Sequence, residues 1–252
     1  MKYAYQSPKW SLTDENHQAH LLAIMAARDA GVAHIFYTSL AFGGDGMNRS
    51  AAHVMQAHLQ TEEVLRAWSL DKVKKFSFTA IREGIYSESF PMYTGFPDLA
   101  NPSEVVKIPH DGTGPGVAWV KIEDLGEATA KLVQKYATAD GDDEEYKNKI
   151  VLLSGSKAYN LAETVQVLAN VTGRDIEIKS VTVEDYTQLP IVQQQLGSHG
   201  TGDVPKKWVT SFEAIQKGET AVTSANIEKL LGRSPEPFET TVARMVKEAR
   251  PS

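Results

Sequence analysis

Residues 32–44, VAHIFYTSLAFGG, decide the fold of this chain. Nearly continuous β-branched and aromatic residues precede the hydroxyl side chains of Tyr37, Thr38 and Ser39, and the run then breaks at a pair of glycines. Such a run is typical of a strand that helices cover on both faces, as in a parallel sheet. Open α/β sheets bind their ligands at the C-terminal ends of these strands. The stretch therefore predicts an α/β fold with a ligand site beside the three hydroxyl groups.

Strand and helix patterns alternate on both sides of this stretch. We expect strands at 2–7, 32–40, 76–86, 150–155 and 175–182, and an extended segment after the turn-rich residues 111–116. We expect helices at 13–31, 51–68, 121–137, 160–173, 183–196 and 224–231, and a last helix after 232–237. Asn160 can cap the helix that follows it, and Gly173 can end that helix. This alternation predicts βαβ units, and hence a mostly parallel sheet flanked by helices with a small C-terminal α+β cap.

The composition narrows the classes of function. The chain has 252 residues, a formal net charge of -6 and a pI near 5.7, which argues against binding to nucleic acid or to an anionic membrane. It has no cysteine, which excludes disulfides, thiolate catalysis and iron–sulfur clusters. No apolar stretch is long enough to span a bilayer, and the first residues lack the apolar core of a signal peptide. We therefore expect a cytoplasmic protein.

A nucleotide-binding α/β protein usually carries a glycine-rich phosphate loop between a strand and a helix. Three glycine-rich segments occur here: GGDG at 43–46, GTGPG at 112–116 and GSHGTG at 197–202. The first lacks the G-x-G-x-x-G spacing, the second contains a proline and precedes an extended run, and the third follows a helix. No Walker A motif is present either. The sequence therefore offers no recognisable cradle for a diphosphate.

Common catalytic patterns are also absent. One Tyr–Lys pair has the four-residue spacing of short-chain dehydrogenases, Tyr5 with Lys9, but Pro8 between them rules out a helix interior. The G-x-S-x-G motif of serine hydrolases does not occur. His17 and His20 are three residues apart and could share a metal, although solvated helix histidines are the favoured interpretation. The acidic run at 140–145 is expected to be a solvated loop, so no metal site is predicted.

Several motifs together resemble one family. They are GVAHIFYTSLAF at 31–42, AHLQTEEVLRAW at 57–68, FSFTAIREGIYSESF at 76–90, VAWVKIEDLGEATAKLV at 117–133 and IEKLLGRSPEPFE at 227–239. Their combination resembles the NmrA-like group of atypical short-chain dehydrogenases. Within it, the pattern is most similar to the NADPH-dependent quinone oxidoreductases of the second type and their fungal relatives. The resemblance covers nearly the whole chain and implies a Rossmann-like parallel sheet.

The N-terminus departs from the family pattern. Members begin with a strand, a glycine-rich turn and two further βα units before a strand that resembles residues 2–7. The resemblance thus implies a truncated NAD(P)-binding region at 1–175 and a C-terminal substrate cap at 176–252, interleaved with the loop 86–120. Three explanations of the short start are open: a truncated gene model, a splice form or a true shortened homologue. We expect residues 2–7 to form an edge strand, and the half-sheet to favour a homo-oligomer.

The resemblance also implies roles for individual residues. Thr38, Ser39 and Leu40 lie where family members line the nicotinamide ribose. His58 aligns with a position that holds a Lys in several relatives, where it touches the ribose or polarises the substrate. Ser39 and His58 are therefore the candidate catalytic residues. The loop expected to pack against the nicotinamide consists of Glu83, Gly84, Ile85 and Tyr86.

An apolar pocket for a flat substrate is implied on the same grounds, and its expected lining residues are Phe42, Tyr86, Phe90 and Trp119. Each assignment has a structural alternative. Ser39 can simply end a strand, His58 can be a surface histidine, and the aromatic residues can belong to the core.

Three functions stay open at this point. The first is an NADPH-dependent reductase of a quinone or related carbonyl compound, with NADP or NAD as its cofactor. The second is a redox sensor that binds dinucleotide without turnover and reports to a transcription factor. The third is a pseudoenzyme that binds no cofactor, if the truncated chain is the true product. The substrate, the choice between NADP and NAD, and the oligomeric state are not readable from these residues.

Overall fold

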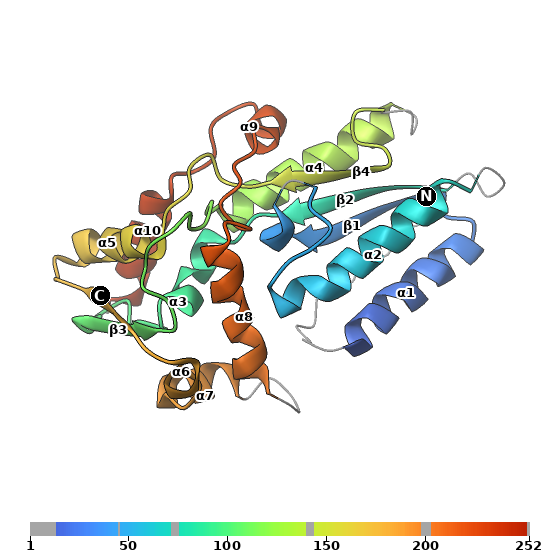
Figure 1. Cartoon of the computed structure of the whole chain (residues 1–252). Helices are drawn as coiled ribbons and strands as arrows, with labels where there is room; N and C mark the ends of the chain where they lie inside the picture. Colours follow the sequence, from blue (N-terminus) through green and yellow to red (C-terminus); the bar gives the residue numbers. More distant parts are fainter. Residues whose placement is uncertain (1–13, 45, 72–75, 140–143, 198–202, 251–252) are drawn as a thin grey trace.

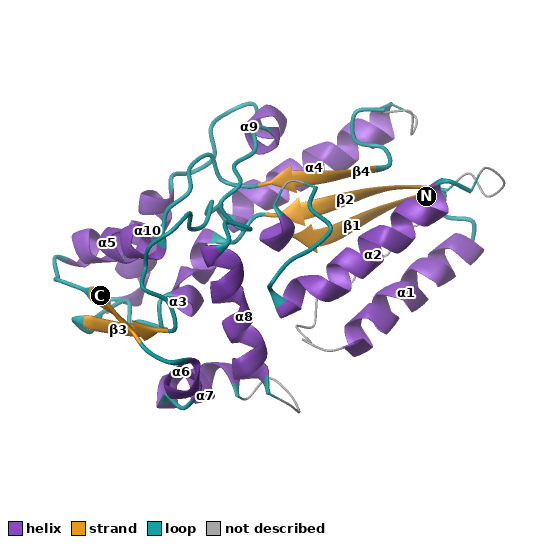
Figure 2. Ribbon diagram, in the orientation of Figure 1, coloured by secondary structure: helices purple, strands orange, loops and turns teal. Residues whose placement is uncertain are grey.

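The computed structural model describes residues 14–44, 46–71, 76–139, 144–197 and 203–250; the expected strand at 2–7 lies outside them. Its main sheet has three parallel strands, β1 (His34–Leu40), β2 (Ser77–Glu83) and β4 (Lys149–Leu153), in the order β1-β2-β4 (Figures 1 and 2). The strands match the runs predicted at 32–40, 76–86 and 150–155 to within a few residues. The expected parallel sheet is confirmed.

Helices cover both faces of this sheet (Figure 1). On one face, α1 (Asp14–Asp29) and α2 (His53–Ser69) pack Ile24 and Leu65 against Phe78 and Ala80 of β2. On the other face, α4 (Ile122–Thr138) and α9 (Asn226–Leu231) pack against the remaining strand side chains, such as Ile81. Because successive strand residues point to opposite faces, each strand needs apolar residues throughout, which explains the continuous runs in the sequence.

A smaller layer lies beyond the C-terminal ends of these strands (Figure 2). It contains a parallel pair, β3 (Val105–Ile108) with β5 (Glu177–Ser180). Its helices are α3 (Phe90–Tyr93), α5 (Leu161–Thr172), α6 (Val183–Thr187), α7 (Pro190–Leu196), α8 (Val204–Gln216) and α10 (Phe238–Ala249). The layer buries a large aromatic cluster, in which Trp119 stacks on Phe238 with ring centroids 5.4 Å apart.

Local signals account for several boundaries in this layer. Asn160 and Glu163 form a capping box at the start of α5, and Gly173 ends that helix with a left-handed φ of 70°, as predicted. The single helix predicted at 183–196 is wrong. It is divided into α6 and α7 at Pro190, because proline cannot continue a helix interior and disfavours helical geometry at the residue before it. The predicted extended segment at 117–120 forms isolated bridges, Val117 with Tyr159 and Val120 with Tyr86.

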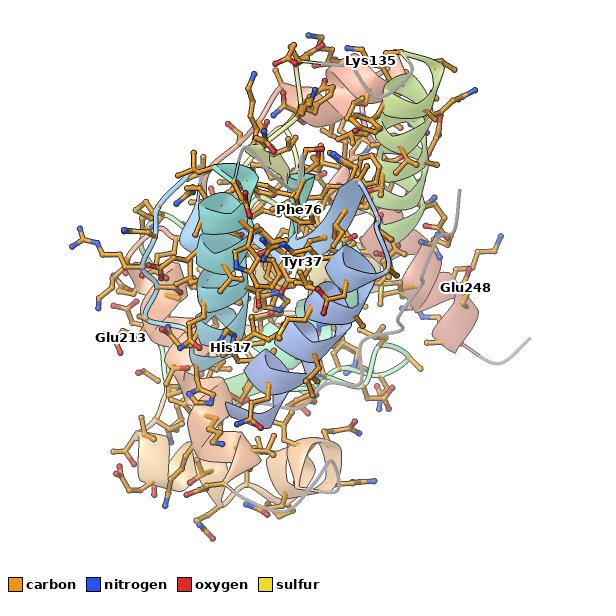
Figure 3. All side chains as sticks on the ribbon, turned by 90° about the vertical axis from the view of Figure 1, so that its right-hand side faces the viewer. His17, Tyr37, Phe76, Lys135, Glu213 and Glu248 are labelled. Carbon is orange, nitrogen blue, oxygen red and sulfur yellow. The ribbon has the colours of Figure 1, made fainter. Side chains whose placement is uncertain are left out.

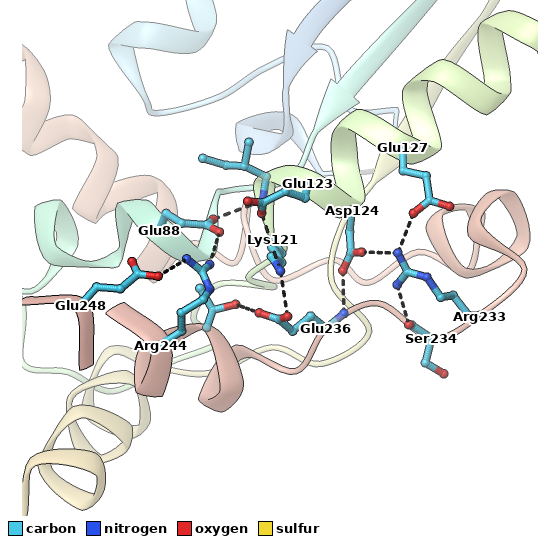
Figure 4. Close-up of polar contacts among 12 residues, drawn as sticks. Glu88, Lys121, Glu123, Asp124, Glu127, Arg233, Ser234, Glu236, Arg244 and Glu248 are labelled. Atoms are coloured by element: carbon cyan, nitrogen blue, oxygen red, sulfur yellow. Dashed lines mark hydrogen bonds and ion pairs between the residues drawn. The ribbon is translucent and has the colours of Figure 1, made fainter. Parts of the chain in front are cut away.

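Ionic contacts join the start of α4 to the segment before α10 (Figure 4). Lys121 contacts Glu236 at 2.8 Å, and Arg233 contacts the buried carboxylate of Asp124 at 2.8 Å. The backbone N–H of Glu236 also donates to Asp124, at 2.6 Å. These contacts fix the C-terminal segment to the helix that supports the main sheet. None of the described helices is long and apolar enough to cross a membrane.

Candidate functional site

The C-terminal ends of β1 and β2 lie side by side in parallel register. Ser39 is opposite Arg82, and Leu40 is opposite Glu83. Because successive strand residues point to opposite faces, the Ser39–Arg82 pair and the Leu40–Glu83 pair lie on different faces of the sheet. Ser39 and Arg82 contact Glu62 of α2, whereas Thr38, Leu40 and Glu83 belong to the face on which α4 packs. The residues predicted for one site are therefore divided between two faces of one sheet edge.

On the α2 face, Arg82 is fully buried and organises the loop that follows β1. Its Nε and Nη2 donate to the two carboxylate oxygens of Glu62, at 3.0 and 2.7 Å. Its Nη1 donates to the carbonyls of Gly43 and Gly44, at 2.8 and 3.1 Å, and Nη2 also donates to the carbonyl of Met47 at 2.7 Å. All five N–H donors of the guanidinium thus have acceptors. This network holds the glycine loop against the end of the sheet.

The hydroxyl of Ser39 belongs to the same network. Ser39 is 1% exposed, and its Oγ donates to Glu62 Oε1 at 2.7 Å. The structure therefore places the Ser39 side chain in a buried polar cluster next to Arg82. A cavity of about 240 Å³ borders this cluster between the loop and α2, and Gln56, Gln60 and Arg66 are among its lining residues.

Thr38 and Leu40 lie on the other face of the sheet and are less buried than Ser39. Thr38 is exposed and Leu40 half-buried, on a strand that ends the three-stranded sheet formed by the described residues. A hydroxyl and an aliphatic side chain thus stand two residues apart at an accessible strand end. This pairing suits the edge of a flat heteroaromatic ring with an attached sugar, because it offers an apolar contact and a hydrogen-bonding group.

The loop after β2 is fixed by a close approach of two chain segments. A Cβ on Gly84 would lie 2.6 Å from Val120 Cγ1 and 2.7 Å from the carbonyl oxygen of Leu153, so this position requires glycine. The Gly84 N–H donates to that carbonyl at 2.7 Å, and the buried Ile85 accepts a hydrogen bond from the Val120 N–H at 3.0 Å. The expected nicotinamide loop is therefore a rigid piece of backbone.

A carboxyl–phenol pair lies on this loop. Tyr86 donates its hydroxyl proton to Glu83 Oε2 at 2.6 Å. Burial raises the pKa of Glu83, and the hydrogen bond from Tyr86 opposes that shift in part. Because Glu83 is opposite Leu40 in the sheet, the pair borders the accessible end of β1.

His58 lies on α2 and contacts β1. Its Nδ1 is 2.7 Å from the Tyr37 hydroxyl, which lies between α1 and α2 (Figure 3) and is also 3.2 Å from His20 Nδ1. Burial, together with the nearby His20 and Arg82, lowers the pKa of His58 to about 3, so its imidazole is neutral at pH 7. The favoured interpretation of His20 as a solvated histidine is wrong, because its ring is packed against β1 and α2. Within the described ranges, no three His, Asp or Glu side chains gather as a metal site.

Three of the expected substrate-pocket residues are core residues in this structure. Phe42, Phe90 and Trp119 are 2%, 0% and 3% exposed, and they pack in one cluster with Tyr93. Trp119 also donates from Nε1 to Thr164 at 3.1 Å. Tyr86, the fourth, packs against the α4 cluster.

Sequence reasoning did not select Glu62 and Arg82. Two signals could have found them: a lone arginine inside the apolar run SFTAIRE, and a glutamate four residues after His58 on the same helix face.

This chain is similar in sequence to a known protein family and to a fungal protein. The profile of the NmrA-like family matches residues 10–238. Over 232 residues, the chain is 30% identical to the NmrA-like family domain-containing oxidoreductase flvB of Aspergillus flavus, a match that covers 92% of this chain and 68% of that protein.

Solved structures show the same fold. The triphenylmethane reductase of Citrobacter sp. is 25% identical, with a TM-score of 0.68, over 96% of this chain and 74% of that one. The NADPH-dependent quinone oxidoreductase QOR2 of Escherichia coli, solved with NADPH, is 21% identical with a TM-score of 0.67, over 94% and 74% of the two chains.

Proposed function

The chain belongs to the NmrA-like family, and from this premise we propose that it is an NAD(P)H-dependent oxidoreductase that reduces a quinone or a related carbonyl compound. One observation carries the proposal: the parallel ends of β1 and β2 present the exposed Thr38, the half-buried Leu40 and the Glu83–Tyr86 pair at one edge of the sheet. Ligands of open α/β sheets bind at this edge.

The described residues fit the nicotinamide half of the cofactor. In the proposed arrangement, Leu40 and the rigid backbone at Gly84 and Ile85 support the ring, and the Thr38 hydroxyl binds the ribose. The backbone at Gly84 is held in place by internal packing, because a Cβ there would lie 2.6 Å from Val120 Cγ1 and 2.7 Å from the Leu153 carbonyl oxygen. NADP is the proposed form, since structural neighbours include a quinone oxidoreductase and a triphenylmethane reductase solved with it. The proposal assigns no described residue to the diphosphate.

When bound, the reduced cofactor supplies the hydride, and this chain supplies orientation and charge stabilisation. The carbonyl oxygen gains negative charge as the hydride arrives, so a hydrogen-bond donor beside it lowers the barrier. Glu83, which lies at the same edge of the sheet as Thr38 and Leu40, is the proposed donor, and burial raises the pKa of its carboxyl group. His58 contacts Tyr37 on the α2 face of the sheet and takes no part in this arrangement. Ser39 takes a supporting role through Glu62 in this proposal, since its hydroxyl is already engaged there.

A second candidate function is redox sensing, in which the protein binds dinucleotide without turnover and reports to a protein partner such as a transcription factor. The closed aromatic cluster favours it. Phe42, Phe90 and Trp119, the residues implied by the resemblance to line a substrate pocket, are core residues that are each at most 3% exposed.

Titration of the purified protein with NADPH, followed by NADPH oxidation with a panel of quinones, tests both candidates. Saturable binding with quinone-dependent oxidation supports the reductase, and binding without turnover supports the sensor. Absence of saturable binding overturns both. Thr38→Tyr is the blocking variant, because it fills the accessible end of β1. Thr138→Tyr is its control: that residue is also exposed, but it ends α4 and lies outside the proposed site.

A further inference from the structure

The cavity that borders α2 lies apart from the proposed cofactor site. Its volume is about 240 Å³, and it is lined mainly by α2, with Asn48 from the loop after β1 and Arg82 from β2. It lies on the α2 face of the sheet, whereas Leu40 and Glu83 belong to the α4 face. A cavity of about 150 Å³ is large enough to hold benzene. The space beside α2 therefore has room for a small metabolite.

Two buried side chains form the inner wall of this cavity and give it a fixed shape. Glu62 and Arg82 are 3% and 0% exposed. Arg82 uses all five N–H donors on Glu62 and on backbone carbonyls, and Glu62 accepts from Arg82 through both carboxylate oxygens. Glu62 also accepts from Ser39. Because these two charges neutralise each other, recognition of a ligand falls to the other lining residues.

Glu63 and Arg66 also line the cavity, and their charges are unpaired. The two residues are exposed and three apart on α2, a spacing at which opposite charges on a helix can form an ion pair. Such pairs form elsewhere on the helices, as between Glu127 and Lys131 at 2.6 Å. Among the residues that the structure describes, however, neither the Glu63 nor the Arg66 side chain has an ion-pair or hydrogen-bond partner. The cavity is thus bordered by one free carboxylate and one free guanidinium.

Amide side chains and one apolar side chain complete the lining. Asn48 and Gln60 are exposed, and within the described part of the chain their side chains have no hydrogen-bond partner. Gln56 donates from Nε2 to two backbone carbonyls near the start of α2, which leaves its Oε1 as an acceptor. Leu59 is the apolar member. The walls therefore offer hydrogen-bond donors and acceptors, one free charge of each sign and a contact for an aliphatic group.

We propose that this cavity binds a small α-amino acid with an aliphatic side chain, as its zwitterion. The guanidinium of Arg66 binds the carboxylate, for which its planar set of donors is suited, and the Glu63 carboxylate binds the ammonium group. Leu59 contacts the aliphatic side chain. Two carboxylates and two guanidiniums line the cavity, so their charges sum to zero. A zwitterion satisfies both free charges at once, whereas a ligand with a single charge leaves one of them without a partner.

Isothermal titration calorimetry at pH 7 with three related probes tests the proposal. L-Leucine carries both charges, isocaproate lacks the ammonium group and isoamylamine lacks the carboxylate. We expect saturable binding of L-leucine, with each of the other probes at least about tenfold weaker, because each leaves one charged hydrogen bond unmade. The proposal is overturned if L-leucine does not bind saturably, or if it binds no more tightly than either of the other two probes.

Two conservative variants assign the binding to this cavity. In Arg66→Gln, L-leucine should bind about tenfold more weakly and lose its advantage over isoamylamine, and in Glu63→Gln it should lose its advantage over isocaproate. Glu248→Gln and Arg250→Gln are the controls: both residues are exposed at the end of α10, outside the lining, so every affinity should stay unchanged. Thermal unfolding should match the wild type in all four variants. Binding that both α2 variants leave unaffected would overturn the proposal. The probes and variants do not touch the site proposed for the reductase, so this test is independent of that function.

Discussion

One guanidinium holds both carboxylate oxygens of Glu62: Arg82 donates from Nε at 3.0 Å and from Nη2 at 2.7 Å, and neither side chain is more than 3% exposed. The pair connects β2 to α2, and through the carbonyls of Gly43, Gly44 and Met47 it connects both to the loop at the proposed site. A charge pair without access to water is costly to break, because either partner alone would be a buried charge.

Glu62→Leu should therefore lower the free energy of unfolding by about 3–5 kcal/mol, since it leaves Arg82 buried without a counter-ion. Urea denaturation measures this change. The matched control is Glu213→Leu, which breaks an exposed pair with Lys217 and should cost less than about 1 kcal/mol. A similar cost for the two variants would contradict the role given to the buried pair.

Gly84 and Gly126 differ in what a methyl group would meet. An added Cβ at Gly84 collides with Val120 and with the backbone of Leu153, whereas at Gly126, exposed inside α4, it meets nothing within 4 Å. Gly84→Ala should lower stability by about 1–3 kcal/mol, through overpacking. Gly126→Ala should raise it by about 0.5–1 kcal/mol, because alanine favours helix. Thermal unfolding of both variants checks the opposite signs; a stable Gly84→Ala protein would show that this backbone can shift.

The main strands could be predicted because helices cover both faces of their sheet, so each strand carries an apolar run that is visible without tertiary information. The helix α8 was not predicted, although Pro205 in its first turn is a helix-start signal, because it follows the glycine-rich segment 197–202, which has the pattern of a linker. The burial of Ser39 against Glu62 could not be predicted either. Its partner Glu62 is 23 residues away, and a glutamate in the amphipathic helix α2 has the pattern of a surface charge until the sheet is assembled.

Asp124 receives two hydrogen bonds, from Arg233 and from the Glu236 N–H, while Glu127 shares the same arginine from an exposed position (Figure 4). Asp124→Asn should lower the free energy of unfolding by about 1–3 kcal/mol, because its carboxylate is 3% exposed and engaged by charged and backbone donors. Glu127→Gln, the control, should cost less than about 1 kcal/mol. Limited proteolysis of residues 232–237 should be faster in the first variant; equal rates would contradict this anchoring role.

His34 should make stability depend on pH. Burial and the nearby Lys147 lower its folded-state pKa to about 4, against about 6.5 in an unfolded chain. Between these values the unfolded state binds more protons, so stability should fall as the pH drops from 6.5 toward 4. His34→Gln should remove part of this slope in urea titrations. At pH 8 the His34 ring is neutral in both the folded and the unfolded state, so the effect of His34→Gln there reports only the loss of its hydrogen bonds to Ser77 and Thr79. If the dependence of stability on pH were the same in His34→Gln as in the wild type, the prediction would be contradicted.

Ser39→Ala separates a supporting role from direct contact with the cofactor. Because the hydroxyl donates to Glu62 and is 1% exposed, its removal should lower stability by about 1–2 kcal/mol. The KM for NADPH should stay within about twofold, since a group held inside the network contributes little to binding. Thr38→Val removes a hydroxyl from the neighbouring, exposed position and should have the opposite profile, with near-native stability and a raised KM. If Ser39→Ala instead raised the KM more than Thr38→Val did, the ribose would be bound on the α2 face of the sheet, and the site built on Thr38 and Leu40 would be wrong.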